Sequence, residues 1–446
     1  MAEAGRDSGG MARDYYFLSD LHLGGDGELQ RCDFAAEFIT FLKALEAKGT
    51  DSELIIGGDT FGFWELTTVE GVAKFDEIVR HHQAIFDQLK ATGERVRITV
   101  MVGNHDYDLA CDPAFAERLA RYNLHLDTAI SLRREMLGRT IWIEHGQQAD
   151  PFNASPDYGN RYALPVGYYI TETIVAGASR HSEFGRGNWL KDIRSVATDQ
   201  IPDWVVSNYF YREMAWVVRG VISVFLLLLT VAGIALVAEL ARRAGLIDAN
   251  YILRNPVIRS LGFVGNIFVA IIAVNMVILF FMLLMAIPGA VVLHDIRRTL
   301  SRFRLSFGGM ESIEGLGNDV YLARARQVFA EHPETAVYLF GHTHDAFLVE
   351  EEGRVIANMG TWLKILHRVP VRFGYLPAVY YPSFRLNVFH IVEEDGQIAV
   401  HYVEAPKTPE RELGWLQRIL TFGRKVPPPK PIPARTVIDP RRPLRR

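Results

Sequence analysis

Residues that can bind a metal recur at the ends of short apolar runs along this chain of 446 residues. They form five blocks, in chain order Asp20-Leu21-His22, Gly58-Asp59, Gly103-Asn104-His105-Asp106, His145, and Gly341-His342-Thr343-His344. A mixture of carboxylate, imidazole and amide ligands suits Mn²⁺, Fe²⁺ or Zn²⁺, whereas Mg²⁺ and Ca²⁺ sites usually contain oxygen ligands alone. The set is larger than one ion needs, so it predicts a site for two divalent metal ions.

The chemistry expected of such a site is hydrolysis of a phosphate ester or anhydride. Two ions about 3.5–4 Å apart can share a carboxylate, activate a water and stabilise the charge that grows on a phosphoryl group. The structural alternative is that these residues form turns at strand ends, where Asp, Asn, Gly and His are common. Five blocks in order, each after an apolar run, favour the metal site.

The blocks resemble the calcineurin-like metallophosphoesterase superfamily, whose motifs are D-x-H, G-D, G-N-H-D or G-N-H-E, H, and G-H-x-H. The resemblance implies two ligand sets that share Asp59: Asp20, His22, Asp59 and His344 for one ion, and Asp59, Asn104, His145 and His342 for the other. It also implies that His105 stabilises or protonates the leaving oxygen and that Asp106 orients His105. Mn²⁺ is the favoured ion, with Fe or Zn as alternatives.

Strands are expected before each block, over residues 15–18, 54–56, 97–102, 140–144 and 336–340. In a layered α/β protein the carboxyl ends of such strands converge on one rim, so distant residues can share a pocket. A helix that begins with Asp33 as its N-cap and ends before Gly49 is expected between the first two strands. The predicted fold is an α/β (α+β) sandwich of mixed β-sheets flanked by helices, which the resemblance also implies.

Two long uncharged runs interrupt the interval between His145 and Gly341, over residues 220–238 and 260–293. Both exceed the roughly 18 residues at which a transmembrane helix becomes the default interpretation. We therefore expect an insertion over 161–310 that carries a transmembrane hairpin with helices at about 218–240 and 262–293. The insertion would divide the phosphoesterase domain into residues 15–160 and 311–405. A helix pair buried in a soluble core is the alternative.

The expected topology has two spans, because ligand residues on both sides of the hairpin require an even number of crossings. Six arginines flank the hairpin on the catalytic side, and four lie in its loop: Arg212, Arg219, Arg297, Arg298, Arg302 and Arg304, against Arg242, Arg243, Arg254 and Arg259. This small difference places the catalytic domain in the cytoplasm. Two cysteines, Cys32 and Cys111, without metal-binding spacing fit a reducing compartment.

The remaining segments are predicted from composition. Residues 1–14 form a polar, disordered leader; residues 406–423 form a short amphipathic helix, either on the bilayer surface or packed on the catalytic domain; residues 424–446 form a Pro- and Arg-rich tail, extended or disordered. The net charge of −4 gives no reason to expect nucleic-acid binding. The oligomeric state stays open.

A finer resemblance concerns the UDP-2,3-diacylglucosamine pyrophosphatase branch. It rests on Ser19-Asp20-Leu21-His22-Leu23, on Gly58-Asp59-Thr60-Phe61-Gly62-Phe63-Trp64, and on Ala114-Phe115-Ala116-Glu117. It implies cleavage of a lipid-linked pyrophosphate to UMP and diacylglucosamine phosphate, with the bilayer as partner. The alternatives are hydrolysis of soluble nucleotides or phosphoproteins with the hairpin as an anchor, and a non-catalytic membrane scaffold with a structural metal site. By position, Trp64, Asp150, Asn153 and Arg161 line the pocket, or else serve turns and packing.

Overall fold

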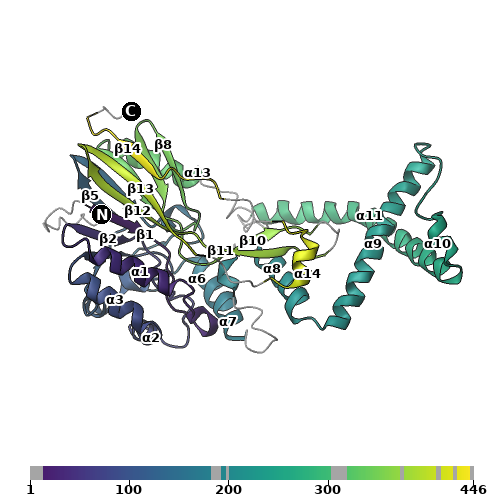
Figure 1. The fold of residues 1–446 in the computed structure, drawn as a ribbon, viewed down its shortest axis with the longest axis horizontal. Helices are drawn as coiled ribbons and strands as arrows, with labels where there is room; N and C mark the ends of the chain where they lie inside the picture. The colour runs from purple at the N-terminus through teal and green to yellow at the C-terminus, as the bar shows by residue number, and fades with distance from the viewer. Residues whose placement is uncertain are drawn as a thin grey trace.

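A computed structural model describes residues 14–181, 192–196, 200–302, 319–371, 376–407, 413–424 and 429–441. The predicted disordered leader lies outside these residues, except for Asp14, which begins the first strand. Figure 1 shows a layered domain that contains a seven-stranded and a five-stranded sheet, a two-stranded sheet of β10 (Ile365–Val369) and β11 (Val379–Ser383), and two long helices that extend away from the domain.

The larger sheet has seven strands, in the spatial order β14 (Arg435–Ile438), β13 (Gln397–Ala405), β12 (Leu386–Glu394), β1 (Asp14–Leu18), β2 (Ser52–Ile56), β3 (Arg97–Met101) and β4 (Leu124–Asp127). Strands β1 to β4 run parallel to one another, whereas β12 is antiparallel to both β1 and β13. The parallel arrangement brings the carboxyl ends of β1, β2 and β3 to the same edge.

The smaller sheet has five strands, in the order β5 (Ser131–Met136), β6 (Arg139–Glu144), β7 (Thr335–Phe340), β9 (Arg354–Asn358) and β8 (Phe347–Glu351). Its central strands β6, β7 and β9 are parallel, and β5 and β8 pair antiparallel at the edges. Both sheets are therefore mixed, as the sequence predicts.

Alternating side chains build the layers of the domain. In β1, Tyr15 and Phe17 join a core that also contains Ile143 and Leu339 from the smaller sheet, so the two sheets pack face to face. The other face of the larger sheet is covered by α1 (Ala35–Glu46), α2 (Ala73–His81), α3 (Gln83–Gly93) and α5 (Ala114–Ala120). Helix α13 (Asp319–Glu331) covers the outer face of the smaller sheet.

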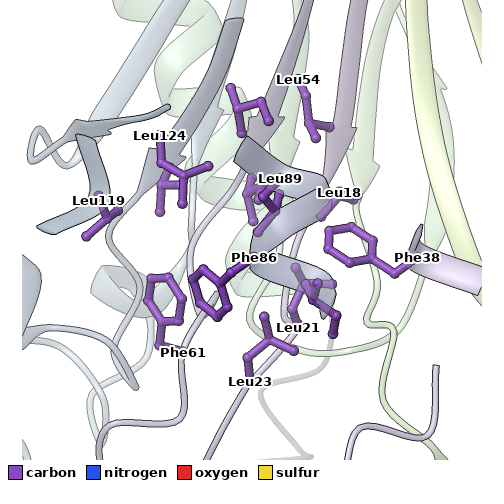
Figure 2. Packing of buried hydrophobic residues seen from close by; sticks show 14 of the residues in the cluster. Leu18, Leu21, Leu23, Phe38, Leu54, Phe61, Phe86, Leu89, Leu119 and Leu124 are labelled. Carbon is purple, nitrogen blue, oxygen red and sulfur yellow. The ribbon is translucent and has the colours of Figure 1, made fainter. Parts of the chain in front are cut away.

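Figure 2 shows the core under the first helices, where Leu18 and Leu54 from the sheet lie near Phe38, Phe86 and Leu89 from α1 and α3. The helix expected between the first two strands is present, and Phe38, Leu42 and Leu45 on one of its faces are buried. The predicted N-cap is wrong. The helix begins at Ala35 after Phe34, and the Asp33 carboxylate lies 3.6 Å from the ammonium group of Lys364 instead.

Two helices of the insertion are long and apolar enough to cross a membrane: α9 (Trp216–Arg243) and the first part of α11 (Phe263–Arg302), over Phe263–Val292. They are not core helices of the domain, since only 11% and 17% of their most apolar windows are buried. The alternative of a helix pair inside a soluble core therefore does not fit the structure. Helix α11 contains Pro288 and continues past the apolar part, from Val292 to Arg302.

The two long helices contact each other through small and flexible side chains. Ala232 and Ala235 of α9 pack with Ile272 and Met276 of α11. Small residues allow helix backbones to approach closely, which is the usual basis of helix pairing in bilayers. A short helix, α10 (Pro256–Ser260), lies in the connection between them, at the end away from the sheets (Figure 1).

Part of the C-terminal tail takes the extended form, one of the two predicted alternatives. It forms β14, which pairs antiparallel with β13 through Ile398↔Ile438. The guanidinium of Arg139 also donates to the carbonyl of Pro440. The unpaired edge of β13 explains this order, because an edge strand offers backbone groups to any extended segment within reach. A helix in the predicted amphipathic segment is present as α14 (Trp415–Leu420).

Candidate metal centre

The turns that follow β1, β2, β3, β6 and β7 meet at one edge of the two sheets. Backbone hydrogen bonds join them: the amide of Asp20 donates to the carbonyl of Gly58, and the amide of Gly341 donates to the carbonyl of His145. All seven predicted ligands are thereby brought together, although they come from both halves of the domain.

Five of the seven predicted ligands have left-handed backbone conformations. Their φ angles are 57° at Asp20, 45° at His22, 50° at Asp59, 68° at His342 and 60° at His344. Such conformations are uncommon for residues other than glycine, and they concentrate at sites where function requires them. The turns thus adopt unfavourable backbone conformations that direct these side chains to one place.

Glycine in two of the motifs is explained by close approach. A Cβ atom added to Gly103 would collide with the Asp59 carboxylate, and one added to Gly341 would lie 2.5 Å from Oδ2 of Asp20. Any side chain at these positions would displace a predicted ligand.

The first donor set consists of Asp20, His22 and His344. Nε2 of His22 lies 3.2 Å from Nε2 of His344. Nε2 of His344 lies 3.2 Å, and Nε2 of His22 3.8 Å, from Oδ1 of Asp20. Three potential ligand atoms therefore point to one small volume.

The second donor set consists of Asp59, Asn104, His145 and His342. Nε2 of His145 lies 3.2 Å from both Oδ2 of Asp59 and Oδ1 of Asn104. Nδ1 of His342 lies 2.9 Å from the same Asn104 oxygen. This arrangement brings two imidazoles, one carboxylate and one amide oxygen together.

Asp59 lies between the two sets. Its Oδ2 atom is 3.2 Å from Nε2 of His145 and 3.6 Å from Nε2 of His22. Its other oxygen accepts a hydrogen bond of 2.7 Å from the backbone amide of His105, which fixes the orientation of the carboxylate. One carboxylate oxygen thus faces a donor atom of each set.

The residues present fit divalent metal ions. Oδ1 of Asp20 is buried and makes no hydrogen bond among the described residues, although two imidazole nitrogens lie near it. Buried polar atoms are normally satisfied, so an unsatisfied oxygen facing imidazoles is consistent with a cation between them. Within the described ranges, three groups of side chains could hold a metal ion: Asp20/His22/His344, His22/Asp59/His105 and Asp59/His145/His342.

Outer hydrogen bonds orient the histidine rings. Nδ1 of His145 lies 2.9 Å from the carbonyl of Gly57, and Nε2 of His342 lies 3.0 Å from Oδ2 of Asp150. An N–H at each of these atoms leaves the opposite nitrogen, which faces Asn104, free to act as a ligand. Asn153 in turn donates to the same Asp150 oxygen. Asp150 and Asn153 therefore support a predicted ligand.

Replacing Asp150 with asparagine is expected to weaken metal binding or activity roughly 10- to 100-fold, the usual cost of losing a carboxylate behind a ligating histidine. The measurement is Mn²⁺ affinity by competition with a chelating dye. Asp157→Asn, at an exposed position in the same segment, is the matched control. Unchanged affinity in Asp150→Asn would show that His342 needs no orienting partner.

His105 faces an acid that the sequence motifs do not include. Its Nδ1 atom lies 2.9 Å from Oε1 of the buried Glu65, at an angle unsuited to a hydrogen bond, and its ring packs against His22 with centroids 4.6 Å apart. The ring of Trp64 also packs on His105, with centroids 4.7 Å apart. The sequence gives one signal for Glu65, an acidic residue that ends the aromatic run after Asp59.

Asp106 is not the acid that faces His105. One of its oxygens accepts hydrogen bonds from the amides of Thr60 and Phe61, and the other accepts one from the amide of Gly103. The expectation that Asp106 orients His105 therefore does not agree with the structure. Asp106 instead ties the turn after β3 to the turn after β2, and so positions Asp59 and Asn104. Burial and the nearby charge of Asp59 raise the pKa of Asp106 to about 7.

Two histidines of the site have raised pKa values in the absence of metal. Burial alone would lower the pKa of His145, but the carboxylates of Asp59 and Asp20 outweigh burial and raise it to about 9. The pKa of His22 is likewise raised to about 10, against the effect of burial, by Asp20 and Glu65. Both histidines are therefore protonated at neutral pH until a cation displaces the protons.

Metal binding is accordingly expected to release protons and to strengthen as pH rises from 6.5 towards 9. Each proton released contributes about tenfold in affinity per pH unit, and the gain ends once both histidines are neutral. The measurement is Mn²⁺ titration by calorimetry, without oxygen, in two buffers of different ionisation enthalpy. Equal heats in the two buffers and a flat affinity over this range would contradict the expectation.

The remaining pocket candidate, Arg161, is exposed and lies over the ring of Tyr162, 5.5 Å from its centre. The structure gives it no contact with the donor sets.

A comparison with family models finds none that matches this chain, and a search of curated proteins finds no match either.

Proposed function

We propose that this protein is a membrane-anchored phosphoesterase that uses two metal ions to hydrolyse a phosphodiester or pyrophosphate bond. The observation that carries the proposal is the position of Asp59. Its Oδ2 atom faces both His145 of one donor set and His22 of the other. A carboxylate shared between two mixed oxygen and nitrogen sets is the arrangement that two-metal hydrolases require.

Asp20, His22, Asp59 and His344 would hold one ion, and Asp59, Asn104, His145 and His342 the other. When bound, such ions neutralise phosphate charge and lower the pKa of water. His105, which is partly exposed beside the donor sets, protonates the leaving oxygen as the P–O bond breaks. Glu65, whose Oε1 atom lies 2.9 Å from Nδ1 of His105, takes the orienting role that the resemblance implies for Asp106.

Membership of the calcineurin-like metallophosphoesterase superfamily belongs to the same proposal. Its support is the resemblance of the five motifs, together with two face-to-face mixed sheets whose strand ends carry those motifs. The membrane anchor is supported by the length, apolar composition and exposure of α9 and α11. The cytoplasmic side for the catalytic domain rests on the arginine distribution alone.

A lipid-linked substrate is supported by apolar side chains beside the site. Trp64, which packs on His105, contacts Tyr168 of α6 (Val166–Ile170) edge to face, with centroids 5.7 Å apart. The same segment exposes Val166 and Tyr169, each at 56%. Trp64 itself is buried, so the exposed apolar side chains are Val166 and Tyr169, on the helix that carries its partner Tyr168. Exposed apolar side chains on this helix suit a substrate with acyl chains better than a water-soluble nucleotide.

The test is product analysis by mass spectrometry. Full-length protein in detergent is incubated with Mn²⁺ and UDP-diacylglucosamine, with a chelator as the control. Metal-dependent release of UMP is expected. Chelator-sensitive cleavage of an aryl phosphodiester without UMP release would overturn the substrate and leave the hydrolase. Failure to cleave either compound with metal bound would overturn the proposal.

A further inference from the structure

Helix α14 presents two different faces. Its inward face contains Leu416 and Leu420, which pack, together with Leu413 just before the helix, against Phe210, Tyr211 and Val379. Gln417 and Thr421 are buried on the same side. The spacing of these residues is that of one helical stripe. One side of this predicted amphipathic helix therefore packs on the protein, as one of the two predicted alternatives requires.

The outward face is also apolar. Trp415 is 74% exposed, and Ile419 and Phe422 are each 60% exposed. Trp415 and Ile419 are four residues apart and lie on one side of α14, and Phe422 follows the C-cap Thr421 with a left-handed backbone at φ 54°. Single exposed apolar residues are ordinary, but three large ones within eight residues, on and directly after one short helix, form an apolar patch that is unfavourable in water.

The helix is held rigidly in this orientation. The amide of Gly414 donates to the side chain of Gln417 at 2.8 Å, and the hydroxyls of Thr421 and Tyr381 are 2.6 Å apart. A six-residue helix does not persist alone in water, so these contacts and the inward leucines maintain it. Rotation of Trp415 and Ile419 into the protein would break this packing.

The position of α14 indicates what covers the outward face. The cluster that holds its inward leucines also contains Met214 and Ile222, which bracket the first turns of α9. Figure 1 shows α14 beside β10 (Ile365–Val369), β11 (Val379–Ser383) and the start of α9. Trp216, at the first position of α9, is 81% exposed. The patch thus continues the surface at which α9 would enter a bilayer.

We infer that α14 is a second membrane contact, an interfacial helix that inserts Trp415, Ile419 and Phe422 between lipid headgroups beside the first span. The inference rests on the membrane anchor of the proposed function. Tryptophan is favoured at headgroup depth, and the exposed Arg418 on α14 suits anionic lipids. With two contacts in place of one, the catalytic domain cannot rotate freely above the bilayer.

The test uses the full-length chain in nanodiscs of phosphatidylcholine and phosphatidylglycerol. With Cys32 and Cys111 replaced by serine, a spin label is attached at Ile419→Cys, and separately at Ile130→Cys and Val224→Cys. The exposed loop residue Ile130 is the aqueous control, and Val224 of α9 is the lipid control. Collision with O₂ and with a water-soluble nickel complex is measured at each position.

We expect the label at position 419 to collide more with O₂ than with the nickel complex, as at position 224, and the reverse at position 130. A profile at 419 equal to that at 130 would overturn the inference while leaving the anchor intact. A water-exposed label at 224 would overturn both.

Quenching by brominated lipids gives a second measurement that keeps the native cysteines. The lipid-quenched fluorescence of wild type should exceed that of Trp415→Phe. Equal quenching in the two proteins would again overturn the inference.

Discussion

Replacing Asp59 with asparagine is expected to abolish hydrolysis and to reduce the metal content from two ions per chain to one or none. The substitution removes the charge that faces both donor sets but preserves the shape of the side chain, including the oxygen that accepts from the His105 amide. Asparagine also tolerates the left-handed backbone at this position, where φ is 50°. The fold should therefore survive. The measurements are metal content by elemental mass spectrometry and cleavage of an aryl phosphodiester.

The matched control is Asp51→Asn, an exposed aspartate directly before β2, the strand that precedes Asp59. It should retain wild-type metal content and activity. If Asp59→Asn kept two tightly bound ions and full activity, Asp59 would not be the shared ligand, and the proposed centre would be wrong in its most important residue.

Replacing His105 with alanine is expected to lower kcat roughly 10²- to 10⁴-fold, the usual contribution of a positioned acid. Metal content should change little, because the ring faces Glu65 and lies beside the donor sets. The measurement is steady-state cleavage with metal content determined on the same sample. A leaving group of low pKa, such as nitrophenolate, should be affected least because it needs no proton.

His81→Ala provides the control, since His81 is a partly exposed histidine on α2 that pairs with Glu77. It should leave both quantities unchanged. Parallel loss of metal and activity in His105→Ala would make His105 a ligand, in agreement with the group His22/Asp59/His105, and would remove the acid from the mechanism.

The positions of the predicted ligands follow from local patterns in the sequence. Each block comes after an apolar run of strand length, and parallel strands deliver their carboxyl ends to one edge. For this reason the sequence alone predicts that Asp20, Asp59 and Asn104 lie close together. The long uncharged runs specify α9 and α11 in the same direct way.

The partners of these residues could not be predicted as well, because they depend on how turns pack. Asp106 follows His105 directly, yet three backbone amides attract its oxygens away from the ring. Glu65 reaches His105 only because the chain after Asp59 folds back under the turn that follows β3, where the amide of Trp64 donates to the carbonyl of His105. No periodic pattern in the sequence predicts that the chain folds back at this point.

The C-terminal region shows a related limit. Composition in 424–446 suggests an extended or disordered tail, and it does not reveal that the open edge of β13, the preceding strand in the chain, pairs with Arg435–Ile438 as β14. In α14, hydrophobic spacing identifies the helix. Only the surrounding residues Phe210, Tyr211 and Val379 determine which face is inward.

The central claim is that two ions act together, and a metal titration of activity tests it most directly. Metal-free, full-length protein in detergent receives Mn²⁺ in steps while bound metal and cleavage of an aryl phosphodiester are measured in the same sample. We predict little activity up to one ion per chain and full activity at two, with reversal by chelator. Full activity at one ion, or no cleavage with two ions bound, would contradict the claim.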